Sequence, residues 1–90
     1  MGVASTARPD FGQARRRMIE ARDRISSLST REREVLDWLA EGSSNKVIAR
    51  ELDISPRTVE IHRAHMMEKL EADSLSSALR LAFVAGLGTE

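Results

Sequence analysis

The chain has 90 residues, no cysteine, and 14 basic and 14 acidic side chains, so its formal net charge is zero. A chain of this length forms one small domain, and without cysteine it holds neither a disulfide nor a zinc–thiolate site. No apolar run approaches the roughly 18 residues that a membrane span needs, and the first residues lack the apolar core of a signal peptide. We therefore expect a cytoplasmic domain with no membrane partner.

The first part of the chain is predicted to contain a tail and a helix. Residues 1–10 are small and polar and are expected to be disordered. Beyond them, apolar side chains recur at alternating spacings of three and four, as in a heptad seam. The seam is formed by Phe11, Ala14, Met18, Ala21, Ile25 and Leu28. It spans only about two and a half heptads, so two interpretations of the helix over residues 11–27 stay open: a linker that docks on the following domain, or a dimerising or signal-carrying helix.

The predicted domain, residues 28–90, opens with a capping signal. Ser29 and Glu32 have the spacing of a capping box, in which each side chain accepts a hydrogen bond from the other residue's backbone N–H. Trp38 is expected at the edge of the core, and Gly42 ends the helix because glycine readily takes the left-handed conformation. The buried stripe of this helix is predicted to be Val35, Leu36, Leu39 and Ala40.

Two helices separated by a tight turn follow. The first opens at Ser44, an expected N-cap, and the second at Ser55, with Pro56 at the first helical position. Asp53 and Ile54 are predicted to make the turn. This layout is typical of a helix-turn-helix, which many DNA-binding proteins use.

The second helix, residues 55–70, divides into two faces at 100° per residue. The inner face, expected to pack on the first helix, consists of Val59, His62, Met66 and Leu70. The outer face consists of Arg57, Ile61, Ala64 and Glu68, with Glu60 at its edge. An exposed Ile61 beside Ala64 is unusual for a solvated face, and it fits a face that meets a thymine methyl group or a partner.

The local charge of this region predicts modest DNA affinity for a single copy. The basic side chains available are Lys46, Arg50, Arg57 and Arg63. Because phosphate neutralisation supplies much of the affinity for DNA, so small a basic patch predicts a need for dimerisation.

A last helix is predicted to begin after Ser74 and to end at Gly86. Its apolar stripe is Leu75, Ala78, Leu79 and Ala82, flanked on both sides by Leu81, Phe83 and Ala85. This arc is wider than a single core face needs. The surplus is either a subunit interface or additional burial within the core; we expect a homodimer paired through residues 75–85.

The motifs LSTREREVL, SNKVIARELDISPRTVEIHR and MEKL follow one another in this order. Together they resemble the LuxR-type (GerE-like) helix-turn-helix DNA-binding domain, and are most similar to the output domains of FixJ-like two-component response regulators. The resemblance covers residues 28–87. It implies an all-α fold, a four-helix bundle here preceded by an N-terminal linker helix, in which the last helix is the usual dimer contact. In the parent regulators a receiver domain precedes the output domain, so this chain is either an excised domain or a free-standing regulator.

The resemblance also assigns roles by position. It places DNA base reading on Glu60, Ile61 and Ala64, and DNA backbone contacts on Lys46, Arg57, Thr58 and Arg63. Some relatives of this fold carry lysine at the positions of Glu60 and Ala64, so their base preference is not transferred. Glu60 either accepts from cytosine N4 or tethers Arg57 or Arg63. Thr58 either donates to a phosphate or bonds within its own helical turn.

No residue pattern indicates an enzyme. His62 and His65 lie close in sequence, but no third metal ligand is spaced with them, and a core-edge position is the simpler interpretation of His62. We predict a sequence-specific, dimeric DNA-binding output domain of a bacterial transcription regulator, with no catalytic site, metal, cofactor or small-molecule ligand. RNA polymerase is an expected further partner, although no residue identifies its surface. Two alternatives stay open: a protein-binding module that titrates a partner regulator, and a sigma-factor region-4-like domain, against which the apolar last helix counts.

Overall fold

The computed structural model describes residues 11–86. Within this range the chain forms five α-helices and no strand, so the all-α prediction is confirmed. The helices are α2 (Phe11–Ser26), α3 (Thr30–Ala40), α4 (Asn45–Leu52), α5 (Pro56–Lys69) and α6 (Leu75–Val84). None of these described helices is long and apolar enough to cross a membrane. The tail predicted over residues 1–10 and the last residues of the predicted domain, 87–90, lie outside the described residues.

Each helix from α3 to α6 begins at a serine N-cap. The side chains of Ser29, Ser44, Ser55 and Ser74 each accept from the backbone N–H three residues ahead. At the start of α3 the capping box is complete: the Glu32 N–H donates to Ser29 Oγ at 3.1 Å, and the Ser29 N–H donates to Glu32 Oε1 at 2.9 Å. These bonds satisfy backbone donors that a helix start leaves open, so local sequence fixes where the helices begin.

The turn between α4 and α5 depends on one left-handed residue. Asp53 caps α4 with φ 57° and ψ 47°, a conformation that Asp tolerates better than most side chains. The Ile54 N–H then donates to the Ala49 carbonyl at 2.9 Å. Because Ser55 already caps α5, the connection is very short, and it sets the angle between the two helices of the helix-turn-helix.

The core lies where α3, α4, α5 and α6 meet. Its largest fully buried side chains are Leu36, Ile48, Met66, Leu70, Val35 and Val59. The predicted inner face of α5 is therefore confirmed at Val59, Met66 and Leu70, whereas His62 is half-buried. Trp38 packs against the core edge as expected. The prediction was wrong for Ala40: it is the last residue of α3 and is exposed, so the core ends one position before the predicted stripe does.

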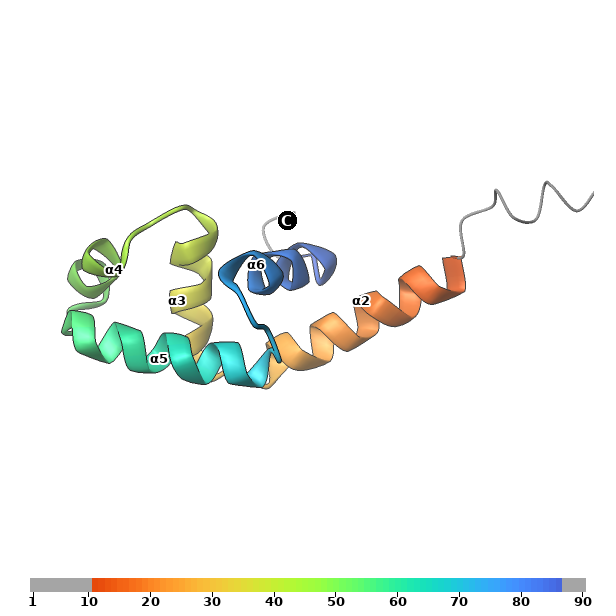
Figure 1. Ribbon diagram of the computed structural model, residues 1–90, viewed down its shortest axis with the longest axis horizontal. Helices are drawn as coiled ribbons and strands as arrows, with labels where there is room; N and C mark the ends of the chain where they lie inside the picture. Colours follow the sequence, from red (N-terminus) through yellow and green to blue (C-terminus); the bar gives the residue numbers. More distant parts are fainter. Residues whose placement is uncertain (1–10, 87–90) are drawn as a thin grey trace, which may run out of the picture.

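Helix α2 projects from the group formed by the other helices (Figure 1). Its C-terminal half docks on them: Ala21 and Ile25 are buried, and Arg22 Nε donates to the Ala85 carbonyl at the end of α6, at 3.2 Å. Cations are favourable at helix C-termini, so this contact ties α2 to α6. Toward its N-terminus the helix is open, since Phe11 is 77% exposed and Ile19 50% exposed. The C-terminal half of the predicted seam thus packs on the following domain, whereas its N-terminal half does not.

Candidate nucleic-acid interface

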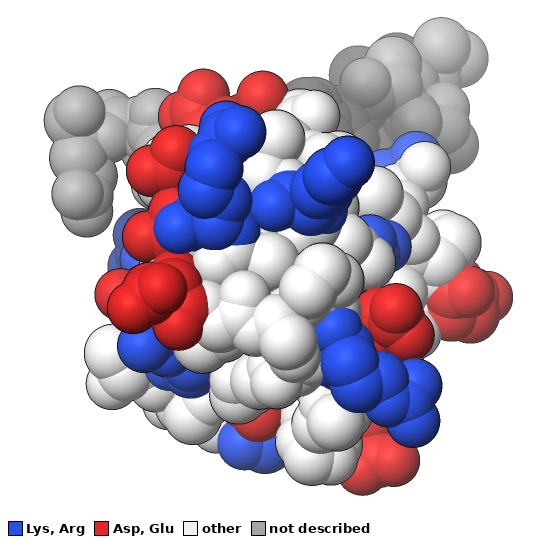
Figure 2. All heavy atoms as spheres, turned by 90° about the vertical axis from the view of Figure 1, so that its left-hand side faces the viewer, with Lys and Arg blue, Asp and Glu red and all other residues white. Residues whose placement is uncertain are grey.

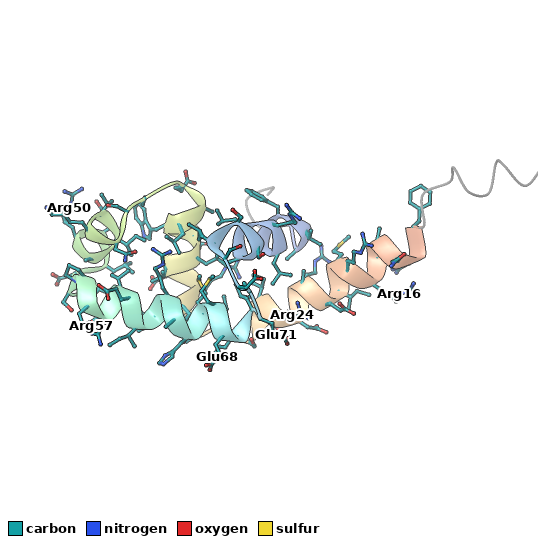
Figure 3. The ribbon with its side chains drawn as sticks, viewed as in Figure 1. Arg16, Arg24, Arg50, Arg57, Glu68 and Glu71 are labelled. Carbon is teal, nitrogen blue, oxygen red and sulfur yellow. The ribbon has the colours of Figure 1, made fainter. Side chains whose placement is uncertain are left out.

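The outer face of α5 is exposed as predicted. Arg57, Glu60, Ile61, Ala64 and Glu68 are all exposed, and 42% of Ile61 is accessible. In Figure 3, Arg57 and Glu68 point to the same side of α5, away from α3 and α6. A continuous helical face, with an apolar centre and a cation near the helix N-terminus, is thus free to meet a ligand.

The start of α4 adds a second cationic element. Lys46 is the second residue of this helix and is exposed. Its side chain forms no hydrogen bond or ion pair with any residue between 11 and 86. The free N–H groups of a helix start attract anions, so Lys46 and the first turn of α4 together can hold a phosphate.

Arg57 and Glu60 form an exposed ion pair. Arg57 Nη1 lies 3.4 Å from Glu60 Oε1, and the two side chains are 79% and 55% exposed. The contact that would make Glu60 a tether for Arg57 is therefore already formed in the protein without DNA. Exposed pairs contribute little stability, so both groups can separate from each other when a ligand arrives.

Arg63 connects the two helices of the motif. Its Nη1 donates to Asn45 Oδ1 at 2.7 Å, across 18 positions of sequence. Asn45 is the first residue of α4, so this bond fixes the helix start that carries Lys46. The sequence analysis missed Asn45, because its partner is brought close only by the fold. Among the described residues the half-buried Arg63 forms no hydrogen bond or ion pair with Glu60, so Arg57 is the arginine that Glu60 tethers.

Thr58 bonds within its own helical turn. Its hydroxyl lies 2.9 Å from Ser55 Oγ, and its N–H donates to the same oxygen at 3.1 Å. The local interpretation of Thr58 is thus present in the structure. The Thr58 hydroxyl can donate to a phosphate only when it accepts, rather than donates, in the hydrogen bond with Ser55 Oγ.

The charges at this end of the molecule are mixed. Residues 45–63 contain four basic side chains (Lys46, Arg50, Arg57 and Arg63) and three acidic ones (Glu51, Asp53 and Glu60). Figure 2 shows separate groups of Lys and Arg around a broad uncharged area, with acidic side chains at several places around its edge. The long-range electrostatic attraction of this surface for a polyanion is accordingly small.

A buried carboxylate holds α5 in place from the other side. The Glu32 side chain is only 6% exposed, and Lys69 Nζ donates to its Oε1 at 2.8 Å. His65 Nδ1 lies 4.0 Å from Oε2. Burial by itself would raise the pKa of Glu32, but the hydrogen bonds from Lys69 and Ser29 outweigh it and hold the pKa below its usual value. No cluster of three potential metal ligands occurs among residues 11–86.

The residues predicted for the dimer interface have different surroundings. Ala78 and Ala82 are 0% and 1% exposed and belong to the chain's own core, while Leu75 and Leu79 are half-buried. The more exposed of two exposed apolar side chains on this helix is Phe83, at 61%, one helical turn beyond Leu79; Val84 is 40% exposed. Part of the surplus apolar arc of α6 is covered by α2, and the pattern of α6 alone could not distinguish that covering from a subunit contact.

Comparisons with known proteins agree with this geometry. Residues 26–82 match the family described as bacterial regulatory proteins, luxR family. The chain is 58% identical over 64 residues to the transcriptional regulatory protein FixJ of Bradyrhizobium diazoefficiens, which covers 71% of this chain and 31% of that protein. It is 40% identical over 65 residues to the response regulator protein TodT of Pseudomonas putida, covering 72% of this chain and 29% of TodT. A crystal structure of full-length FixJ from B. japonicum matches with a TM-score of 0.72 and 52% identity, over 82% of this chain and 38% of that one.

The chain spans about a third of the length of these curated relatives. The family match covers more than half of the chain and includes α3, α4 and α5. It favours the luxR type over the sigma-factor alternative. The chain therefore belongs to the luxR family of bacterial regulatory proteins and contains the helix-turn-helix DNA-binding domain of a FixJ-like regulator.

Proposed function

We propose that the chain binds specific duplex DNA sequences with the N-terminal part of α5 in the major groove, and that it acts in the cytoplasm as the output domain of a response regulator. The observation that carries this proposal is the exposed face of α5, where Ile61 is 42% accessible between charged neighbours. Thymine presents a methyl group in the major groove, and this apolar contact gives the exposed isoleucine a partner.

Base reading falls to Glu60, Ile61 and Ala64. Ile61 and Ala64 meet thymine methyl groups, and Glu60 accepts from cytosine N4 once its pair with Arg57 opens. The exposure of all three side chains supports this assignment.

The DNA backbone is held by Lys46 at the start of α4 and by Arg57 at the start of α5. Both side chains are exposed, and they come from the two helix N-termini of the motif. Thr58 can add a hydroxyl contact to a phosphate. Arg63 contributes by positioning α4 through Asn45, and its remaining donors can reach a phosphate at the edge of the groove.

We further propose that two copies bind half-sites about one helical turn apart, paired through α6. Leu75 and Leu79 retain accessible surface, and Phe83 extends the same ridge. The low local charge supports a dimer, because two weak contacts on one duplex raise the affinity of both. RNA polymerase is the partner through which such a regulator would act on transcription.

The experiment that tests this function is a selection from a pool of random duplexes, repeated at several salt concentrations, with sequencing of the bound fraction. We expect a motif with two half-sites, and binding that falls steeply with added salt as counterions are released. Absence of binding at low salt would overturn the proposal in favour of a protein-binding helix-turn-helix module.

A further inference from the structure

A groove of about 260 Å³ lies between α2 and α6. Figure 1 shows these two helices on the far side of the molecule from α4. Helix α2 lines the groove with Arg17, Glu20 and Arg24, which share one helical face. Helix α6 lines it with Ser77, Arg80, Leu81 and Val84. The groove thus combines an apolar floor with a cationic rim, and none of its residues belongs to the proposed DNA-binding surface.

The rim charges are largely uncompensated. Neither Arg17 nor Arg80 forms a side-chain hydrogen bond or ion pair with any described residue. Arg24 makes only a long exposed contact, its Nη2 lying 3.7 Å from Glu71 Oε1. Glu20 is the single acidic residue in the lining. On the floor, Val84 is 40% exposed, so apolar and cationic groups are presented to solvent side by side.

A second copy of α2 is a poor occupant. With Phe11 at position a of the heptad, positions e and g of this helix are all arginine: Arg15, Arg17, Arg22 and Arg24. These positions face each other across a coiled coil and set the choice of partner. Parallel or antiparallel pairing of two identical helices would therefore bring arginine against arginine. A helix with acidic flanks would instead find opposite charge at Arg17 and Arg24, the two of these positions that line the groove.

DNA is also a poor occupant. A duplex presents phosphates to a basic rim, but its backbone offers nothing apolar to the floor formed by Leu81 and Val84. An amphipathic helix supplies both, because its apolar side chains enter the groove while flanking carboxylates reach the arginines.

We propose that the groove between α2 and α6 is a docking site for an acidic amphipathic helix of another protein. Its carboxylates pair with Arg17 and Arg80, and its apolar side chains lie on Leu81 and Val84. This site does not depend on the proposed DNA contact, because α5 and the start of α4 take no part in it.

The probe is a fluorescein-labelled peptide of about three heptads, with leucine at a and d and glutamate at e and g. Its control carries lysine in place of every glutamate. Fluorescence anisotropy with the full chain should show binding of the glutamate peptide alone, weakened by about tenfold between low and high salt because exposed charge pairs are screened. No binding of the glutamate peptide, or equal binding of the lysine peptide, would overturn the proposal.

Variants locate the binding site. The Arg17→Glu/Arg80→Glu double variant should lose about tenfold or more in peptide affinity, as expected for two lost charged contacts. The Arg15→Glu/Arg16→Glu variant reverses as many charges on α2 outside the groove lining, and it should bind within about twofold of the unmodified chain. Circular dichroism and thermal unfolding confirm that each variant is folded.

A third variant separates this site from the DNA-binding surface. Lys46→Ala/Arg57→Ala should weaken duplex binding and leave peptide binding unchanged. If it abolished peptide binding while Arg17→Glu/Arg80→Glu did not, the peptide would be mimicking DNA on α5 and the groove proposal would be wrong. If Arg17→Glu/Arg80→Glu weakened duplex binding and left peptide binding intact, the groove would be a DNA contact instead.

Discussion

At the scale of single residues, Arg57 carries a highly accessible charge of the proposed interface. It stands in the first turn of α5, its side chain is 79% exposed, and its partner among residues 11–86 is the exposed carboxylate of Glu60. Removing it leaves the core untouched, so its effect on DNA binding can be measured without a loss of folding.

Arg57→Ala should weaken binding to every duplex by on the order of 1 kcal/mol or more, as for a lost charged contact. It should also reduce the slope of log affinity against log salt by about one, because one phosphate is no longer neutralised. Arg16→Ala is the matched control, since Arg16 lies on α2 at the other end of the molecule (Figure 3). Equal affinities for Arg57→Ala and the unmodified chain would remove Arg57 from the interface.

Glu60→Ala should alter the preferred sequence more than the overall affinity. The carboxylate accepts from cytosine N4, whereas alanine accepts from nothing and leaves room for other bases. Selection and sequencing of bound duplexes should return a motif changed at one position of each half-site. Glu68→Ala, on the same face but farther from the helix N-terminus, should return the original motif; an unchanged motif for Glu60→Ala as well would limit Glu60 to tethering Arg57.

Glu32→Gln tests the buried contact that joins α3 to α5. The pKa of Glu32 lies below the value of 4.5 for an unfolded chain, so its ionised form stabilises the fold. That stabilisation is complete above pH 4.5 and is lost as the pH falls through the lower folded pKa. At pH 7 the free energy of unfolding of the variant should be about 1 kcal/mol lower than that of the unmodified chain. This is the difference between a charge-assisted and a neutral hydrogen bond.

Urea unfolding of both proteins, followed from neutral pH downward, measures this difference. The two free energies should converge in acid. Glu34→Gln is the control, because its partner Arg31 lies at 3.0 Å on an exposed surface, where a pair contributes little. A gap for Glu32→Gln that persists unchanged below the folded pKa would show that its cause is not the charge.

At the scale of elements, the sequence predicts what is decided locally. The starts of α3, α4, α5 and α6 follow from serine caps, and the division of α5 into two faces follows from spacing alone. The bonds from Arg63 to Asn45 and from Lys69 to Glu32 span 18 and 37 positions. No local pattern identifies such pairs, so the sequence could not show how α4 and α5 are held.

Helix α6 shows the same limit. The sequence predicts a wide apolar arc on α6, but the pattern does not show which of its residues face the core of the same chain. Ala78 and Ala82 are buried inside the chain, and docked α2 covers another part of the arc. A small residue on an apolar stripe fits close packing within one chain as well as contact between two.

Phe83→Glu tests the proposed dimer surface on α6. The substitution places a charge on a residue that is 61% exposed, so the monomer should remain folded. Cooperative binding to duplexes with two half-sites should fall to the affinity for one half-site, while binding to a single half-site stays unchanged. Phe11→Glu is matched in chemistry and lies on α2, where Phe11 is 77% exposed; loss of cooperativity in Phe11→Glu alone would transfer the dimer contact to α2.

At the scale of the whole molecule, two surfaces of different character lie far apart. One is formed by α5 and the start of α4, with charges of both signs around an apolar centre. The other is the groove between α2 and α6, rimmed by arginine and absent from the sequence analysis. Helix α2 has five basic and two acidic side chains, whereas the rest of the chain has nine basic and twelve acidic ones, so the zero net charge conceals an uneven distribution. We predict that the two surfaces can engage separate ligands at once.

The most direct test of DNA recognition by α5 is a titration of the ¹⁵N-labelled chain with a duplex carrying the selected motif, followed by amide NMR. Shifts should concentrate in residues 44–47 and in the first three turns of α5, on the face of Arg57, Ile61 and Ala64. The amide signals of residues 17–24 and 80–84, beside the groove, should not shift in parallel with those of α5 as the duplex concentration rises. Shifts confined to α2 and α6, with α5 unchanged, would contradict the assignment of α5 as the DNA-reading helix.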